Sequence, residues 1–195
     1  MIITVTAYKG GVGKTTTAVH LAGCLCDQGK TLLVDGDVNR SVLQWNDSGL
    51  LPFTVSDIDN ADLEGYDFVV IDTAAHPLLD DLITLSANSD LMIIPSTPDA
   101  LALGTTAQVV DDLPDVAYKV LLTIVPPRPS KAGKEAKKSL QNAGIPTFKT
   151  EIPRLVVYQK AALAEKLVRD TKVAGWQTAN RVYRELMKEV LDDLQ

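Results

Sequence analysis

The stretch from Lys9 to Thr16 constrains this 195-residue chain more than any other feature. It reads Lys-Gly-Gly-Val-Gly-Lys-Thr-Thr, follows a short apolar run at residues 2–7 and precedes a helical pattern that begins at Thr15. A strand, a glycine-rich loop and a helix in this order are typical of a phosphate site, because the glycines let backbone N–H groups surround phosphate oxygens. The helix N-terminus adds free donors and a favourable dipole. The stretch therefore predicts a nucleotide-binding loop.

The side chains of this loop have separate expected roles. Lys14 supplies a mobile cation for the β- and γ-phosphates, and Thr15 supplies a hydroxyl for Mg²⁺. The common form of the loop has glycine at position 8, where this chain has Tyr8, and a second lysine, Lys9, opens the loop instead. We expect the nucleotide to contact Gly10, Gly11, Val12, Gly13, Lys14, Thr15 and Thr16.

Apolar runs alternate with helical patterns along the rest of the chain. Further strands are predicted at residues 31–34, 68–71, 91–94, 120–125 and 147–150, and helices at 15–28, 78–88, 100–112, 131–143, 156–168 and 175–193. Continuous apolar strands suit a parallel sheet that is buried on both faces. We therefore predict a doubly wound α/β fold, with a mainly parallel sheet flanked by helices, as one domain over residues 1–195.

Acidic residues stand where two of these strands end. Asp35 and Asp37 follow the run at 31–34, and Asp72 follows the run at 68–71. Ligands in such folds bind at the carboxyl ends of the strands. An apolar strand that ends in aspartate downstream of a P-loop is a Walker B arrangement. Asp72 is therefore expected to hold Mg²⁺ or its bound water together with Thr15.

A lysine before paired glycines resembles the deviant Walker A motif of the ParA/MinD family. The resemblance implies a P-loop ATPase in which Lys9 reaches across a dimer interface to the phosphates bound by the partner subunit, so that hydrolysis depends on dimerisation. Asp35-Gly36-Asp37 resembles the switch I segment of that family. By the same resemblance, Asp37 positions or activates the attacking water and Asp35 lies near the Mg²⁺ shell, so catalysis falls to Lys9, Lys14 and Asp37.

Two segments depart from the family pattern. Val38-Asn39 replaces the usual Pro-Gln after switch I, and residues 72–77 match the position of switch II but carry alanines and a histidine, His76, to which we assign no role. The chain lacks a guanine-reading motif at the right place, so the resemblance implies ATP. It places the base against loops after the late strands, here at Pro126, Ile152 and Pro153.

Charge divides the chain unevenly. The net charge is −6, but residues 1–118 hold 4 Lys/Arg against 17 Asp/Glu, and residues 119–195 hold 15 Lys/Arg against 8 Asp/Glu. Such asymmetry indicates a surface that faces a polyanion. The resemblance implies non-specific DNA binding by the ATP dimer. The basic residues expected to contribute are Arg154, Lys160, Lys166, Arg169, Lys172, Arg181 and Arg184, with Lys131, Lys134, Lys137 and Lys138 as a second cluster.

These features favour a small ParA-type partition or positioning ATPase. A ParB-like or cargo-adaptor protein would stimulate hydrolysis and release the protein from the nucleoid, while a plasmid, a chromosome or a protein body such as a carboxysome would be the cargo. A MinD-like membrane-cycling ATPase needs a basic amphipathic tail, and the segment 188–195 is acidic. A metabolic P-loop enzyme of the dethiobiotin synthetase type is the third possibility, and activity stimulated by a small acid would favour it.

The cysteines and the apolar runs indicate the cellular compartment of the protein. Cys24 and Cys26 lie two apart in the first predicted helix, where they do not face each other, which indicates free thiols in a reducing cytoplasm. The first apolar run is too short for a signal peptide, and no run is long enough to span a membrane. We therefore expect a cytoplasmic, nucleoid-associated protein without a membrane partner.

Overall fold

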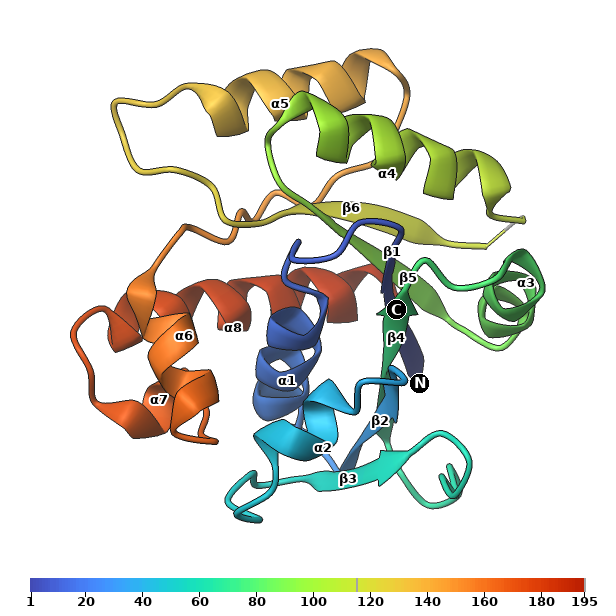
Figure 1. Ribbon diagram of the computed structural model, residues 1–195, viewed down its shortest axis with the longest axis vertical. Helices are drawn as coiled ribbons and strands as arrows, with labels where there is room; N and C mark the ends of the chain where they lie inside the picture. The colour runs from blue at the N-terminus through green and yellow to red at the C-terminus, as the bar shows by residue number, and fades with distance from the viewer. Residues whose placement is uncertain (115, 195) are drawn as a thin grey trace.

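A six-stranded parallel sheet forms the centre of the computed structural model, which describes residues 1–114 and 116–194 (Figure 1). The strand order is β3-β2-β4-β1-β5-β6, so the order reverses around β1 and the sheet is doubly wound, as predicted. The strands are β1 (Ile2–Ala7), β2 (Thr31–Gly36), β3 (Thr54–Asp57), β4 (Phe68–Ala75), β5 (Leu91–Ser96) and β6 (Tyr118–Leu122).

Helices cover both faces of this sheet (Figure 1). The helices are α1 (Lys14–Leu25), α2 (Ser41–Trp45), α3 (Leu79–Ala87), α4 (Ala100–Asp112), α5 (Ala132–Asn142), α6 (Val156–Leu163), α7 (Val168–Thr171) and α8 (Trp176–Asp193). Successive strand side chains point to opposite faces, so Leu33 packs with α1 and α8 while Leu32 packs towards α3. The strands are buried on both sides, which explains their continuous apolar sequences.

Three elements differ between the prediction and the structure. Two short elements, β3 and α2, lie between residues 37 and 67 and were not predicted. The predicted strand at 147–150 is wrong, because only Thr147 forms a bridge, to Val120. The carboxylate of Glu189 on α8 instead accepts the N–H groups of Lys149 and Thr150, each at 2.7 Å.

The predicted helix at 156–168 is also wrong as a single element. It ends at Leu163, and a turn with Glu165 at φ 53° separates α6 from α7. A left-handed residue inside the span interrupts the helical hydrogen bonds, which apolar periodicity alone does not reveal. The turn is held from outside, because Glu165 accepts the N–H of Ser48 at 2.6 Å and the Lys166 carbonyl accepts the Trp45 indole N–H at 3.2 Å.

The parallel register gathers the predicted site residues at one edge of the sheet. Asp35 on β2 pairs with Asp72 on β4, and Asp72 also pairs with Val5 on β1, just before the glycine-rich loop. Carboxyl ends of parallel strands meet at this edge, which is where ligands bind in open α/β sheets. The loop, switch I and the Walker B aspartate are therefore neighbours although they are far apart in the sequence.

Candidate nucleotide site

The glycine-rich loop has the backbone conformation that a phosphate cradle needs. Gly11 and Gly13 adopt φ of 75° and 87°, which L-residues with side chains rarely adopt. Gly13 is the N-cap of α1, and its carbonyl accepts the N–H of Thr17 at 2.9 Å. No side chain of the described residues caps α1. The N–H groups of its first turn are therefore left for a ligand, as in anion sites at helix N-termini.

The loop is held by Thr123, the residue that follows β6. The Thr123 hydroxyl donates to the carbonyl of Val12 at 2.7 Å, and the Val12 side chain is buried. Val12 was predicted to contact nucleotide, but it does not line the cavity beside the loop. Its side chain anchors the loop in the core, while its glycine neighbours face the opening.

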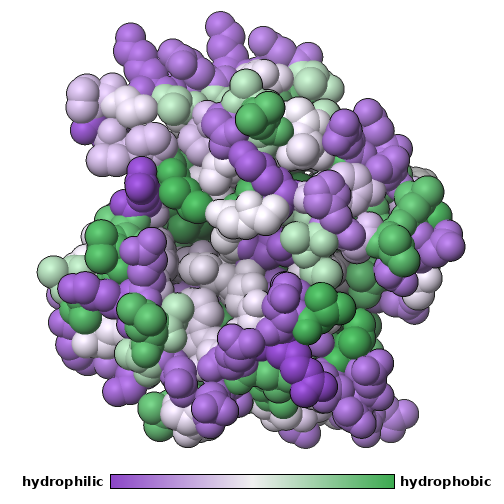
Figure 2. All heavy atoms as spheres, in the orientation of Figure 1, coloured by the Kyte–Doolittle hydropathy of each residue, from purple (hydrophilic) through white to green (hydrophobic). Residues whose placement is uncertain are grey.

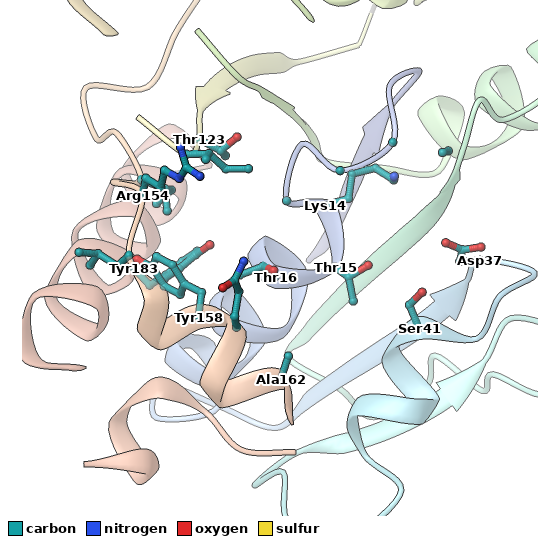
Figure 3. Close-up of a pocket in the computed structure, with 18 of the residues that line it drawn as sticks. Lys14, Thr15, Thr16, Asp37, Ser41, Thr123, Arg154, Tyr158, Ala162 and Tyr183 are labelled. Atoms are coloured by element: carbon teal, nitrogen blue, oxygen red, sulfur yellow. The ribbon is translucent and has the colours of Figure 1, made fainter. Parts of the chain in front are cut away.

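A cavity of about 650 Å³ opens beside the loop, and Figure 2 shows this face of the molecule hollowed near its centre. In Figure 3, Lys14, Thr15, Asp37 and Ser41 lie towards one end, Arg154, Tyr158 and Tyr183 lie towards the other, and Thr16 lies between them. The volume lies within the range of small-molecule and cofactor sites. The cavity therefore has the elongated form that separates a phosphate end from a base end.

Asp72 has a buried carboxylate, unpaired within the described part of the chain, at the phosphate end of the cavity. Its side chain is fully buried, and neither carboxylate oxygen has a hydrogen-bond partner among the described residues. Burial raises the pKa of Asp72 to about 7, against the lowering effects of the nearby Thr15 hydroxyl and Lys14 ammonium. A buried carboxylate without partners is costly unless something pairs with it.

This donor set fits a magnesium ion. Mg²⁺ prefers oxygen ligands, keeps several waters and is commonly bound through one or two protein groups plus substrate phosphates. The described residues contain no group of three His, Cys, Asp or Glu side chains arranged to hold a metal alone. A site that relies on Thr15, Asp72 and the phosphates agrees with both observations, and when bound the ion would neutralise phosphate charge.

Asp35 has a structural task. One carboxylate oxygen accepts the N–H of Asp37 at 3.0 Å, and the other accepts the N–H groups of Val42 and Leu43, both at 2.9 Å. These bonds fix the switch I turn and the start of α2. Both oxygens of Asp35 therefore hold the backbone in place, while its place near the Mg²⁺ shell stays a prediction.

Asp37 lies at the wall of the cavity, and its catalytic role stays a prediction. It lines the cavity with Asn39 and Ser41, at the end that holds Lys14 (Figure 3). One carboxylate oxygen accepts both the backbone and the side-chain N–H groups of Asn39, each at 2.9 Å. The Val-Asn departure from the family pattern thus still holds the aspartate at the cavity. Apart from the two aspartates, no sequence signal predicted that Asn39 and Ser41 would line the cavity.

Lys9 points away from its own cavity. It is absent from the residues that line the cavity, and its ammonium pairs with a carboxylate oxygen of Asp99 at 3.0 Å. Asp99 is the N-cap of α4, and it also accepts the N–H of Ala102 and the Thr97 hydroxyl. These two groups, followed by Lys9, lower the pKa of Asp99 to about 2. Lys9 is therefore a surface cation beside the site.

The base end of the cavity is only partly as predicted. Ile152 and Pro153 line it, whereas Pro126 does not. The reason is that Val125 pairs with the 152–154 segment. Its N–H donates to a carbonyl of that segment and its carbonyl accepts an N–H from it, after which the chain leads away from the cavity. The walls also include Tyr158, Gln159, Ala162 and Tyr183 from α6 and α8, which no motif in the sequence marked.

A buried histidine connects the elements behind this wall. His20 on α1 stacks on Tyr183 with centroids 5.0 Å apart and meets Trp45 and Tyr158 edge-on. The N–H of Val168 donates to its Nε2 at 3.2 Å, so Nδ1–H donates to the Thr16 carbonyl at 2.8 Å. Burial lowers the pKa of His20 to about 4. The ring is therefore a neutral structural group at neutral pH.

The predicted DNA-contacting residues do not form one group. Arg154 lines the nucleotide cavity, and Arg169 pairs with Asp27 at 2.6 Å. Arg181 and Arg184 lie together on α8 in a shallow basic hollow that also contains Trp176. The Lys172 ammonium sits 4.4 Å over the Trp176 ring, and Lys160 and Lys166 lie near the α6–α7 turn. Hydrophilic side chains also gather over α5, which carries Lys134, Lys137 and Lys138 (Figure 2).

Comparison with known proteins agrees with this geometry. The family model of the CobQ/CobB/MinD/ParA nucleotide binding domain matches residues 3–168. A protein of Gloeobacter kilaueensis is named maintenance of carboxysome distribution protein A. It is 32% identical over an alignment of 203 residues, which covers 97% of this chain and 93% of that protein.

Two solved structures share the fold. A proposed plasmid partition protein of Borrelia burgdorferi bound to AMPPNP has a TM-score of 0.74 at 18% identity, over 98% of each chain. The septum site-determining protein MinD of Pyrococcus horikoshii, complexed with Mg-ADP, has a TM-score of 0.70 at 20% identity, again over 98% of each chain. At these identities the two structures establish the fold alone.

Proposed function

This chain belongs to the CobQ/CobB/MinD/ParA nucleotide-binding family, and we propose that it is a ParA-type ATPase that positions a cargo. In this proposal the whole chain acts as one domain, and ATP drives formation of a homodimer that binds nucleoid DNA non-specifically. A ParB-like or cargo-adaptor partner stimulates hydrolysis and releases the protein. The likeness to a carboxysome distribution protein over nearly the whole of both chains supports this class of function.

The observation that carries the proposal is the position of Lys9. Its own cavity already contains one lysine, Lys14, at the phosphate end, whereas Lys9 is held on the surface by Asp99. In a monomer, this second lysine therefore does not contribute to the cavity of its own subunit. In a symmetric dimer with the two cavities facing each other, Lys9 of each copy would reach the phosphates of the other, which makes the complete site a property of the dimer.

The residues around the cavity divide the work of phosphoryl transfer. Lys14 and the first-turn N–H groups of α1 bind the phosphates, while Thr15 and Asp72 hold Mg²⁺. Asp37 orients the attacking water from the side of switch I, and the second copy's Lys9 balances the charge that develops on the transferred group. Positioning and electrostatic stabilisation account for most of the catalysis in this reaction class.

DNA binding in this proposal comes from the basic surface of the C-terminal part. Exposed Arg181 and Arg184 on α8 supply positive charge without any arrangement for reading bases. Contacts of this kind bind phosphates regardless of sequence and weaken steeply with salt. Two such weak surfaces in one dimer bind far more tightly than one, because the second contact becomes intramolecular. DNA affinity would then follow the nucleotide state.

None of the helices in the described ranges 1–114 and 116–194 has the length and apolar character needed to cross a membrane.

The membrane-cycling alternative has less support, because it needs a basic amphipathic tail. The last turns of α8 carry Glu189, Asp192 and Asp193, which oppose binding to an anionic lipid surface. The metabolic-enzyme alternative gives no reason for a surface lysine at position 9.

DNA binding in three nucleotide states tests the proposal. We expect retention on non-specific duplex DNA with ATP, little retention with ADP or no nucleotide, and a steep loss as salt rises. Lys9→Ala should abolish the ATP effect, and Lys30→Ala, far from the cavity, should preserve it. Equal retention in all three states, or pelleting with anionic liposomes in ATP without DNA affinity, would contradict the proposal.

A further inference from the structure

Two residues that depart from the expected motifs contact each other in the structure. Tyr8 occupies the position where the common loop has glycine, and His76 follows the Walker B strand. Their rings stack, with centroids 5.3 Å apart and planes inclined by 13°. The contact joins the first residue of the P-loop region to the segment after Asp72, across 68 positions of sequence.

Tyr8 is a fixed platform in this contact. Its hydroxyl donates to a carboxylate oxygen of Asp112, the last residue of α4, at 2.7 Å, and its ring packs against the cluster that contains Ile94 and Val109. Burial, together with the bond to Asp112, raises the pKa of Tyr8 to about 12, so the donor keeps its proton. The ring is therefore held at its tip by α4 and at its base by the strand.

His76, in contrast, has little else to hold it. It is exposed and adopts φ 54°, a left-handed conformation that costs energy in a residue with a side chain. Its backbone N–H approaches the Ala7 carbonyl only to 3.4 Å, which is longer than a good hydrogen bond. The stack on Tyr8 is thus a side-chain contact that offsets the strain at this position.

The strained residue lies next to the cavity. Ala75, one residue earlier, lines the cavity, and the orphaned Asp72 carboxylate lies four residues earlier. Leu78, two residues later, is largely exposed. A loss of the stack would therefore release the segment 73–77 at its outer end, while β4 would still hold its inner end.

We propose that Tyr8 is a positioning residue which, through the ring of His76, holds the segment 73–77 against the P-loop and sets the phosphate side of the cavity. The inference rests on the proposed ATPase function for its catalytic consequence, although the contact itself does not. Aromatic pairs contribute enough to change a conformational population on the order of 2- to 13-fold. The fraction of molecules with a correctly placed segment should change by that factor.

Proton NMR of the imidazole groups tests the contact without nucleotide. The chain has only two histidines, so His76 and the buried His20 give separable signals. Tyr8→Leu should shift the His76 signals downfield, because the ring current is removed, and should leave those of His20 in place as evidence of an intact fold. Tyr66→Leu, a matched change at a ring that contacts Lys30 instead, should move neither. Unmoved His76 signals in the Tyr8→Leu protein would overturn the proposal.

Hydrolysis kinetics tests the consequence. Tyr8→Leu and His76→Ala should each lower kcat on the order of 2- to 13-fold, with KM for ATP changed by less than about twofold, and the double variant should be no slower than either single one. Tyr8→Phe and His76→Tyr keep stacked rings and should retain most of kcat. Additive losses in the double variant would refute the coupling. If the wild-type protein hydrolysed no ATP, the proposed function would fail, while the NMR result would still decide the contact.

Discussion

Neutralising Asp99 should strengthen the ATP-dependent dimer. Asp99 holds Lys9 on its own subunit at 3.0 Å, whereas the proposed mechanism needs Lys9 at the partner's phosphates. Asparagine at position 99 can still accept the N–H of Ala102 as a helix cap, and its amide can donate to the Thr97 hydroxyl. The change Asp99→Asn therefore removes the charge and keeps the local structure.

The magnitude follows from the exposure of the pair. The Lys9 and Asp99 side chains are 36% and 49% exposed, and such surface pairs contribute about 0.2–1 kcal/mol. Thr97 and Ala102 lower the pKa of Asp99 more than Lys9 does, which agrees with a weak pair. A symmetric dimer must break two pairs, so its dissociation constant should fall by about 2- to 30-fold, the equivalent of about 0.4–2 kcal/mol.

Sedimentation velocity with AMPPNP over a concentration series measures this constant. The gain should shrink as salt rises, because exposed charge pairs are screened. Asp80→Asn is the matched control, since it removes the same charge from the first turn of α3. An unchanged dissociation constant, or a weaker dimer, in the Asp99→Asn protein would refute the reasoning that Asp99 competes with the partner for Lys9.

Four further predictions concern single residues. Asp37→Ala should stop ATP turnover and trap the ATP dimer on DNA, as a phosphate-release assay and DNA retention would show; normal turnover would remove Asp37 from the mechanism. Asp35→Ala leaves three backbone N–H groups without their acceptor and should lower the free energy of unfolding by about 1–3 kcal/mol in urea titration; an unchanged midpoint would show that these three bonds do not stabilise the fold. The depressed pKa of His20, about 4 in the fold against about 6.5 in the unfolded chain, means that the unfolded chain binds the proton first; the contribution of His20 to stability should be complete above about pH 6.5 and fall by up to about 3 kcal/mol as pH drops to about 4, a slope that His20→Gln should remove. Arg181→Glu should weaken DNA binding and reduce its salt dependence while ATP affinity stays the same; equal DNA affinity would exclude this part of α8 from the interface.

Local sequence was sufficient to predict the centre of the site. The P-loop and the Walker B aspartate each depend on a strand, a loop and a few adjacent residues, and the parallel register then brings Asp72 beside β1 without further information. For the same reason the doubly wound fold was predictable, since apolar runs and helical periodicity are local patterns.

Features that depend on the path of the chain were not predictable. Asp35 became a cap because the switch I turn brings the N–H groups of Val42 and Leu43 back to it. Pro126 does not line the base end of the cavity, because Val125 pairs with the 152–154 segment. The stack of Tyr8 on His76 joins two positions whose side chains carry no mutual signal in a single sequence.

Mixing two inactive variants tests the central claim, that a second copy completes the site. Lys9→Ala keeps Asp37 but lacks the lysine for its partner, and Asp37→Ala supplies the lysine but lacks the water-positioning carboxylate. Each protein alone should hydrolyse ATP poorly. In an equimolar mixture, half of the randomly formed dimers have one complete site of two, so activity should recover to about one quarter of the wild-type rate. A mixture no more active than the mean of its two components would contradict the account.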